Sequence, residues 1–390
     1  MDWESIKQIK GLKSISQIGA ATIGGNAIAA FFWIYMADFM GQEDYGELGY
    51  LLSIASIAST ISILGGQWTM SVYTAKGIRI ESSLYFISII TSTISAAVLY
   101  FLFENVGISV YVVGLVVFNL FIAEILGKKQ YKKYSKIFFS QKIILVALAI
   151  ILYYILGVEG VLLAYGISYL VFTSRIISTL KNRDFNFELL RKRFKFWMNN
   201  YVYELSSTAR NQIDILLIGP LFGFALLGNY FLGLQVLSLF LILPLIIFRY
   251  TLPEDSSGSS TKQIKIMAIV ASIGLALLGI FVAPEIIPLV LPEYTDVIDL
   301  IPLLSIAIIP RTTTAMLMSG FLAKENNKYL VLGNVISISV LVLGILYFPQ
   351  YFDVVGLAIA YVLGVTAQTI YLIVLHLRIT KIQSSNTNQI

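Results

Sequence analysis

The strongest constraint on this chain is a series of apolar runs, each about 20 residues long, that recur along its whole length. A run of that length matches an α-helix that crosses about 30 Å of hydrocarbon. Open strands are excluded, because a sheet edge leaves backbone groups without hydrogen bonds in lipid. We therefore predict an all-α polytopic membrane protein. Its twelve transmembrane helices are expected over residues 15–36, 47–68, 83–103, 106–126, 137–156, 160–179, 201–219, 225–247, 264–283, 298–320, 328–348 and 354–377.

The charges beside these runs alternate in sign. The segments that follow the odd-numbered runs, with the helix ends beside them, carry Asp and Glu but no Lys or Arg, and the segment after the seventh run carries no charge. The acidic residues are Asp38, Glu43, Asp44, Glu47, Glu104, Glu159, Glu285, Glu293, Asp296, Asp299 and Asp353. The tails and the other loops carry Lys and Arg. Short loops rich in Lys and Arg stay in the cytoplasm, so both termini are predicted to be cytoplasmic.

The chain also repeats itself. Val158–Tyr165 resembles Val354–Tyr361 at a shift of 196 residues, and Leu126–Lys132 resembles Leu322–Lys328 at the same shift. Two matches in one register indicate a parallel repeat about an axis along the membrane normal.

The repeat predicts two pseudo-symmetric six-helix lobes around a central cavity. We expect an N-terminal lobe over 1–180 and a C-terminal lobe with a short polar tail over 201–390. The linker 181–200 interleaves Phe and Trp with Arg and Lys, which predicts a basic amphipathic helix on the cytoplasmic membrane surface. Two such lobes are typical of a transporter that works by alternating access.

Three segments resemble those of a known family. They are Gly41–Tyr50, Gln212–Tyr230 and Glu285–Tyr294, which carry Gly-x-x-x-Tyr-Gly, an Asp followed by Leu-Gly-x-Tyr, and an outer loop, respectively. The family is that of the polysaccharide or O-antigen flippases (Wzx-like). It belongs to the multidrug/oligosaccharidyl-lipid/polysaccharide (MOP) superfamily, which also contains the MATE transporters.

The resemblance implies a substrate, a place and partners. The substrate is a polyprenyl-diphosphate-linked oligosaccharide, which is moved across the cytoplasmic membrane during surface polysaccharide biosynthesis. Membrane lipids, a coupling ion (H⁺ or Na⁺) and glycan polymerase or transferase machinery are the implied partners. The glycan and the carrier lipid, undecaprenyl or dolichyl, stay open.

Charges inside the spans are the first candidates for a site, because each costs about 2.5–3.5 kcal/mol at mid-helix. Arg210 and Asp214 are four residues apart, so they share one helix face. They can neutralise each other as a buried pair, or the arginine can meet a substrate diphosphate. Asp214 is also a candidate carrier of the coupling ion, since its pKa responds to burial and to Arg210.

Arg311 follows Pro310 directly and has no acidic residue one turn away in its own helix. A proline there frees a backbone carbonyl and permits a kink. Arginine binds phosphate with planar, bidentate contacts. We expect Arg210 and Arg311 to come from opposite halves and to meet across the central cavity. The alternative for Arg311 is snorkelling to the headgroups.

Uncharged polar residues inside the spans complete the candidate site. Asn26 and Gln67 are predicted to bind sugar hydroxyls, and interhelical hydrogen bonding is the alternative. Gly24-Gly25-Asn26 predicts either a bend in the first helix or close helix packing. Pro244 is a further candidate for a kink.

Several classes of chemistry are disfavoured. The chain has no Cys and one His, His376, which argues against thiol chemistry and a His-based metal site. It has no P-loop, so ATP hydrolysis is not expected. We predict no catalytic residue, cofactor, metal or nucleic-acid partner, and no enzyme. We attribute the net charge of +5 to membrane topology, because the positive loops are expected to face anionic lipid headgroups on the cytoplasmic side.

The alternatives to a flippase of this kind are a MATE-type multidrug or cation exporter and a lipid II flippase. A cation exporter favours acidic cavity residues, which two arginines contradict. A membrane polymerase or glycosyltransferase usually carries a large outer loop, and none is predicted here.

Overall fold

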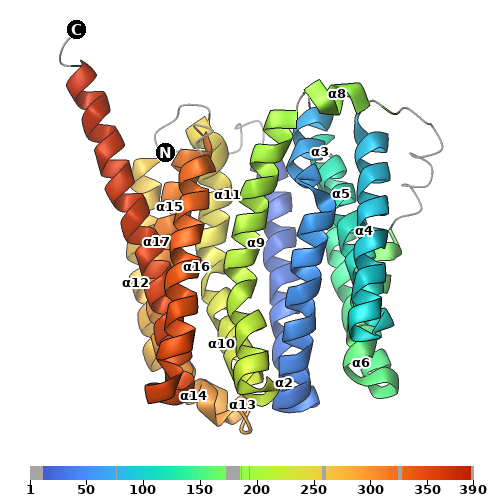
Figure 1. The fold of residues 1–390 in the computed structure, drawn as a ribbon. Coiled ribbons are helices and arrows are strands. Elements are labelled where there is room, and N and C mark those ends of the chain that lie inside the picture. Colours follow the sequence, from blue (N-terminus) through green and yellow to red (C-terminus); the bar gives the residue numbers. More distant parts are fainter. Residues whose placement is uncertain are drawn as a thin grey trace. The chain divides into compact units, whose positions relative to one another are not determined.

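The computed structural model describes residues 12–75, 77–172, 185, 187–192, 194–256, 261–323 and 327–387. The regular elements of these residues are all helices, as predicted (Figure 1). They form two compact units. Unit 1 comprises Met1–Phe32 and Tyr50–Leu205, and unit 2 comprises Trp33–Gly49 and Ser206–Ile390.

Unit 1 is built around α5, which packs against α3, α4 and α6. Its helices are parts of α2 (Leu12–Ile63), α3 (Gly66–Ala75), α4 (Glu81–Phe103), α5 (Val106–Gly127), α6 (Tyr131–Leu170), α8 (Phe187–Lys192) and the start of α9 (Phe194–Phe222). Side chains satisfy the free N–H groups at the start of α5. Asn105 Oδ1 accepts from Ile108 N at 2.9 Å, and Glu159 Oε1 accepts from Val106 N at 2.8 Å.

Unit 2 holds the later helices. They are α10 (Phe224–Phe240), α11 (Ile242–Ser256), α12 (Lys262–Phe281), α13 (Ala283–Val290), α14 (Thr295–Ile306), α15 (Ile308–Ala323), α16 (Asn327–Tyr347) and α17 (Pro349–Thr387), together with parts of α2 and α9. Within this unit α16 lies along α17, and α15 packs against α11, α12 and α17 (Figure 1). The site described below is formed by α9, α10, α15 and α17.

Two long helices each contain two of the expected spans. Backbone breaks divide them at Gly41 in α2, with φ 75°, and at Gly157 in α6, with φ 61°. Glycine adopts this left-handed region without a steric penalty, so these positions let the chain turn between spans. Residues 173–179, the end of the sixth expected span, lie outside the described part of the chain.

Proline produces the breaks expected in unit 2. α10 and α11 are bent by 50° at Leu241, three residues before Pro244. α14 ends and α15 begins around Ala307, three residues before Pro310. A proline ring removes one helical hydrogen bond and clashes with the carbonyl four residues earlier, which explains the common spacing. The predicted kink at Pro244 is confirmed, and the helix is interrupted before Pro310 within a segment, Asp296–Ala323, that counts as one span.

The glycines of the first span are used for packing instead of bending. α2 is helical through Gly24-Gly25-Asn26. A Cβ atom on Gly25 would lie 2.6 Å from Cε1 of Phe138 in α6, so the glycine permits this close contact. The second alternative, close helix packing, is therefore the one that the structure supports.

Eight of the described helices are long and apolar enough to cross a membrane, or nine if the bent pair α10 and α11 forms one span. α2 and α6 count once each in this number, and α9 is not among these helices. The chain therefore has the composition of a multi-pass membrane protein. The count of twelve, the cytoplasmic termini and the lobe boundaries 1–180 and 201–390 stay predictions.

Two of the segments that carry the family resemblance pack closely in unit 2. A Cβ atom on Gly46 of α2 would lie 1.9 Å from Phe224 O, and one on Gly228 of α10 would lie 2.0 Å from Gln42 O. The two helix backbones can approach this closely only because both positions are glycine. The Gly-rich part of the resemblance therefore has a structural cause.

The third segment joins them through tyrosine. Tyr45 is fully buried, and its ring lies 5.2 Å from that of Phe231 and 6.3 Å from that of Tyr294. Tyr294 OH donates to Ala37 O at 2.8 Å. Tyr45 and Tyr294 are therefore packing residues of unit 2.

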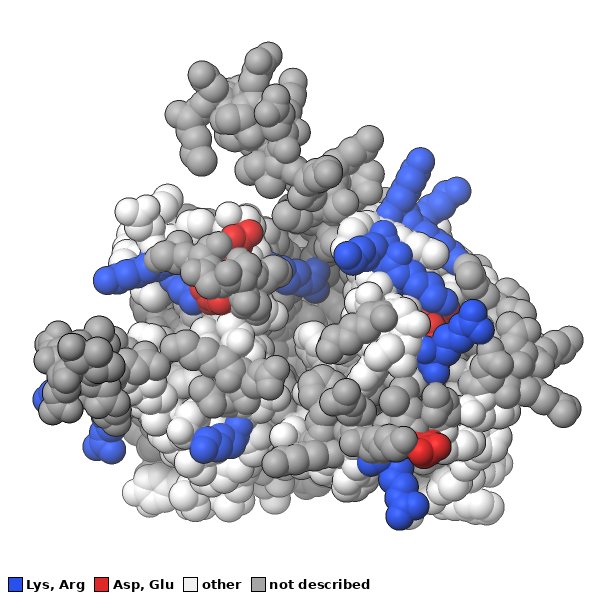
Figure 2. All heavy atoms as spheres, turned by 90° about the horizontal axis from the view of Figure 1, so that it is seen from above, with Lys and Arg blue, Asp and Glu red and all other residues white. Residues whose placement is uncertain are grey.

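The linker carries the short helix α8 of six residues. The rings of Phe185 and Phe187 stack at 5.7 Å, and both lie beside the ring of Phe86 in α4. The face seen in Figure 2 shows many Lys and Arg side chains and few Asp and Glu. Residues 181–184, 186 and 193 lie outside the described residues, and the predicted position of 181–200 on the membrane surface stays a prediction.

Candidate functional site

Two arginines approach each other inside unit 2. Arg210 lies in α9 with 6% of its surface exposed. Arg311 is half-buried in the first turn of α15, where it follows Pro310. The expectation that they come from opposite halves is wrong, since both lie within the predicted C-terminal lobe 201–390 and belong to unit 2. They meet at Asn211 of α9, to which both side chains donate.

Asn211 lies between the two guanidinium groups. Its Oδ1 accepts from Arg210 Nη1 at 2.8 Å and, more weakly, from Arg311 Nη1 at 3.4 Å. Two donors on one side of the carboxamide require its oxygen there, which fixes the orientation of the amide. One neutral oxygen is thus shared by two cations.

The two guanidinium groups have unused hydrogen-bonding capacity. The Nε atoms of Arg210 and Arg311 are both buried without a hydrogen-bond partner. No carboxylate forms an ion pair with either arginine in the described parts of the chain. Arg311 is also stacked over the ring of Tyr361 at 5.7 Å, so its guanidinium faces this cluster. Within the described residues, the arrangement is a pair of like charges with no carboxylate in ion-pair contact.

Asp214 makes its closest polar contact with a tyrosine and not with Arg210. Its carboxylate is 1% exposed, and Oδ2 accepts from Tyr230 OH of α10 at 2.7 Å. No ion pair joins Asp214 to Arg210 among the described residues. The two side chains of the predicted pair therefore attract each other without direct ion-pair contact. A role for Asp214 in carrying a coupling ion stays a prediction.

The segment that carries Arg311 is held by α17. Thr369 Oγ1 donates to Pro310 O at 3.0 Å and contacts Thr314 Oγ1 at 2.9 Å. These contacts fasten α15 on both sides of the arginine. The proline break and the threonine pair together determine where Arg311 points.

The other predicted site residues are elsewhere. Gln67 lies half-buried in α3 of unit 1. Asn26 lies in α2, and its side chain is outside the described residues. Arg210, Arg311 and Asp214 thus belong to unit 2, and Gln67 belongs to unit 1. The described residues contain no group of three His, Asp or Glu that could hold a metal.

Sequence reasoning missed three residues of this cluster. Asn211 had a signal, since it is a polar residue beside Arg210 inside an expected span. Tyr361 and Tyr230 were noticed only within the repeat and the family segments. Tyr165, the repeat counterpart of Tyr361, packs against the rings of Phe32 and Tyr111 in unit 1. The tyrosine at this repeat position therefore packs against aromatic rings in unit 1, whereas in unit 2 it stacks against the guanidinium of Arg311.

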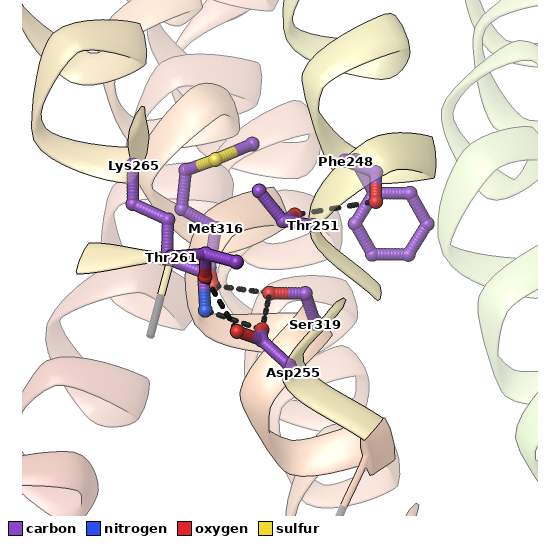
Figure 3. A network of polar contacts seen from close by, with 7 residues as sticks. All are labelled: Phe248, Thr251, Asp255, Thr261, Lys265, Met316 and Ser319. Atoms are coloured by element: carbon purple, nitrogen blue, oxygen red, sulfur yellow. Dashed lines mark hydrogen bonds and ion pairs between the residues drawn. The ribbon is translucent and has the colours of Figure 1, made fainter. Parts of the chain in front are cut away.

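A second charged cluster lies at the end of α11 (Figure 3). Asp255 accepts from Lys265 Nζ at 2.5 Å, from Thr261 Oγ1 at 2.5 Å and from Ser319 Oγ at 2.7 Å. Burial raises the pKa of Asp255, but these three hydrogen bonds outweigh it and leave the pKa below its usual value. This cluster ties α11 to α12 and α15.

A third cluster, in unit 1, is also neutralised. Lys128 Nζ lies 2.5 Å from Glu124 Oε1 and 3.8 Å from Glu81 Oε1. Tyr85 OH donates to the other oxygen of Glu124 at 2.8 Å. Lys128 and Lys265 therefore have carboxylate partners, and the arginine pair does not.

Solved structures identify the fold. By sequence alone, no protein family and no curated protein matches the chain. An inward-facing multidrug resistance MATE family transporter of the MOP superfamily is similar with a TM-score of 0.68 at 13% identity, over 92% of this chain and 95% of that one. An outward-facing structure of a multidrug resistance MATE family transporter has a TM-score of 0.66 at 15% identity, over 95% and 96%.

A third similar structure is a MOP superfamily transporter from Pyrococcus furiosus, for which a reverse polarity of the binding pocket suggests a different function. Its TM-score is 0.64 at 15% identity, over 95% of this chain and 96% of that one. The chain therefore has the fold of MATE and MOP superfamily transporters over nearly its whole length. The fold is that of proteins that move substrates across membranes.

Proposed function

We propose that this protein is a flippase that moves a polyprenyl-diphosphate-linked oligosaccharide across the cytoplasmic membrane for surface polysaccharide biosynthesis. It works by alternating access and catalyses no chemical reaction. One observation carries the proposal: Arg210 and Arg311 converge on one oxygen without a carboxylate counter-ion.

A diphosphate supplies what this cluster lacks. Two like charges in a medium of low dielectric repel each other strongly, and a bound dianion turns that repulsion into attraction. The free Nε atoms can complete bidentate contacts with phosphate oxygens. The diphosphate is the constant part of every lipid-linked glycan, so one cationic site serves whatever sugars follow.

The main alternative is a multidrug or cation exporter, which the similar MATE structures make compatible with the fold. The arginine pair argues against it, because two positive charges with no carboxylate in ion-pair contact repel a cationic drug. A lipid II flippase would use the same diphosphate chemistry. The glycan supplied in the experiment below distinguishes these cases.

The test is restoration of surface glycan in a strain that lacks its own flippase. The wild-type chain is compared with Arg210→Ala and Arg311→Ala at equal membrane levels. Arg378→Ala, at an exposed arginine of α17, is the matched control. We expect the wild type and the control to restore the glycan and both cluster variants to lose restoration.

Two results would count against the proposal. Restoration that survives both substitutions would remove the arginine pair from the transport mechanism. No restoration with any lipid-linked glycan, together with drug efflux from the same cells, would favour the exporter. The coupling ion, H⁺ or Na⁺, and any glycan polymerase or transferase partner belong to the same proposal.

A further inference from the structure

We propose that the side chain of Asn211 is a place-holder for the substrate: its amide oxygen occupies the position of a phosphate oxygen and is displaced when the anion binds. The inference rests on the proposed function, since it requires an anionic substrate. It assigns a specificity-determining role to a residue that contributes no charge.

The geometry places the oxygen where an anion would bind. Asn211 Oδ1 lies within hydrogen-bond distance of the Nη1 atoms of both Arg210 and Arg311. A phosphate oxygen that accepts hydrogen bonds from both guanidinium groups would occupy this same position. The unequal distances, 2.8 Å and 3.4 Å, show that one amide oxygen does not satisfy both cations fully.

Exposure makes displacement feasible. Asn211 is exposed, whereas its neighbour Arg210 is buried. An exposed side chain changes rotamer on the picosecond to nanosecond timescale without repacking a core. The amide can therefore leave while the arginines stay in place, which keeps the site ready for its ligand.

The choice of an amide over a carboxylate follows from charge. An aspartate at this position would form charge-assisted hydrogen bonds to both arginines, about twice as strong as neutral ones. It would then compete with the substrate. A residue without a polar side chain would leave the two cations to repel each other. Asn211 holds the arginines together without neutralising them.

The inference predicts opposite effects of two substitutions. Asn211→Asp should stabilise the ligand-free protein and weaken anion binding. Asn211→Ala should destabilise the ligand-free protein and leave binding as tight as in the wild type, or tighter. A residue that merely packs, or one that binds the substrate directly, would not give this inverse relation between stability and affinity.

The experiment uses the full chain in nanodiscs. Farnesyl diphosphate is the probe, and farnesol is the uncharged control ligand. Binding is measured by calorimetry, and the unfolding temperature is measured without ligand. Gln212→Ala, which removes an amide from the next position of α9, is the matched control variant. For Asn211→Asp we expect an affinity for farnesyl diphosphate about tenfold or more weaker, with a raised unfolding temperature.

Each outcome decides something. If Asn211→Ala weakens binding as much as Arg210→Ala does, Asn211 is a direct ligand contact and the place-holder role is wrong. If Asn211→Asp changes neither affinity nor stability, the inference is also wrong. If the wild type binds no probe but Asn211→Asp still raises the unfolding temperature, the proposed substrate is wrong, whereas the charge balance around Asn211 is supported.

Discussion

Unit 2 contains two charged clusters that differ in how their charges are balanced. At the end of α11, Asp255 and Lys265 form an ion pair that Thr261 and Ser319 complete with hydrogen bonds. In the other cluster, Arg210 and Arg311 face each other across one amide oxygen. The first cluster is neutral and satisfied, and the second carries two charges and two unpartnered Nε atoms.

This comparison distinguishes charges that stabilise the fold from charges that are available to bind a ligand. A buried charge without an ion-pair partner costs free energy, which makes it a candidate for a functional group. The Asp255 cluster fastens three helix ends and needs nothing more. The arginine cluster is unfavourable in the ligand-free protein, and an anion would relieve it. Substitutions should therefore act in opposite directions at the two places.

The largest effect should come from Asp255→Ala. It leaves Lys265, whose side chain is 20% exposed, without its counter-ion, and it frees the hydroxyls of Thr261 and Ser319. We expect a loss of about 2–3 kcal/mol in the free energy of unfolding. Thermal unfolding of the purified protein measures this loss, with Lys262→Ala at the exposed start of α12 as the control. Equal stability of the two variants would show that the cluster is not a structural element.

The arginine pair should respond with the opposite sign. Arg210→Leu removes one of two repelling cations and keeps an apolar side chain in the same space. We expect a gain of about 1–2 kcal/mol in the free energy of unfolding together with loss of transport. Arg378→Leu, at an exposed arginine, is the control and should change neither. A destabilised Arg210→Leu would mean that the guanidinium is a structural group, and the comparison between the clusters would fail.

Part of this arrangement could be predicted from the sequence. The apolar runs predicted the helices, and Pro244 and Pro310 predicted the two breaks, because both signals are local along the chain. Arg210 and Arg311 were chosen because each is a charge inside a span. Their meeting within one unit was not predicted, since it depends on which helices are neighbours. Asn211 and Tyr361 were missed because only the folded unit brings them to the arginines.

A smaller effect tests how the Asp255 cluster divides its energy. Ser319→Ala removes the hydroxyl that lies 2.7 Å from Asp255 Oδ2 and leaves the ion pair with Lys265 in place. We expect a loss of about 1 kcal/mol in the free energy of unfolding, the usual value for one hydrogen bond. Thr313→Ala, at a half-buried hydroxyl that bonds within α15, is the control. A loss as large as that of Asp255→Ala would show that Ser319 positions the whole cluster.

The smallest effect is a difference in pH dependence between the clusters. Burial raises the pKa of Asp255, but the hydrogen bonds from Lys265, Thr261 and Ser319 lower it by more, so the pKa lies below its usual value. A lowered pKa stabilises the fold above the pKa of an unfolded aspartate, about 3.9, and that stabilisation disappears as the pH falls through the folded value. The stability difference between the wild type and Asp255→Ala should therefore stay constant from about pH 7 to about pH 5 and shrink below about pH 4. Arginine stays charged throughout this range, so the difference between the wild type and Arg210→Leu should not change. Unfolding temperatures of the three proteins over this range test both statements. A constant difference for Asp255→Ala down to the lowest pH would show that the stability of that cluster does not come from its charge, and the contrast with the arginine pair would then rest on packing alone.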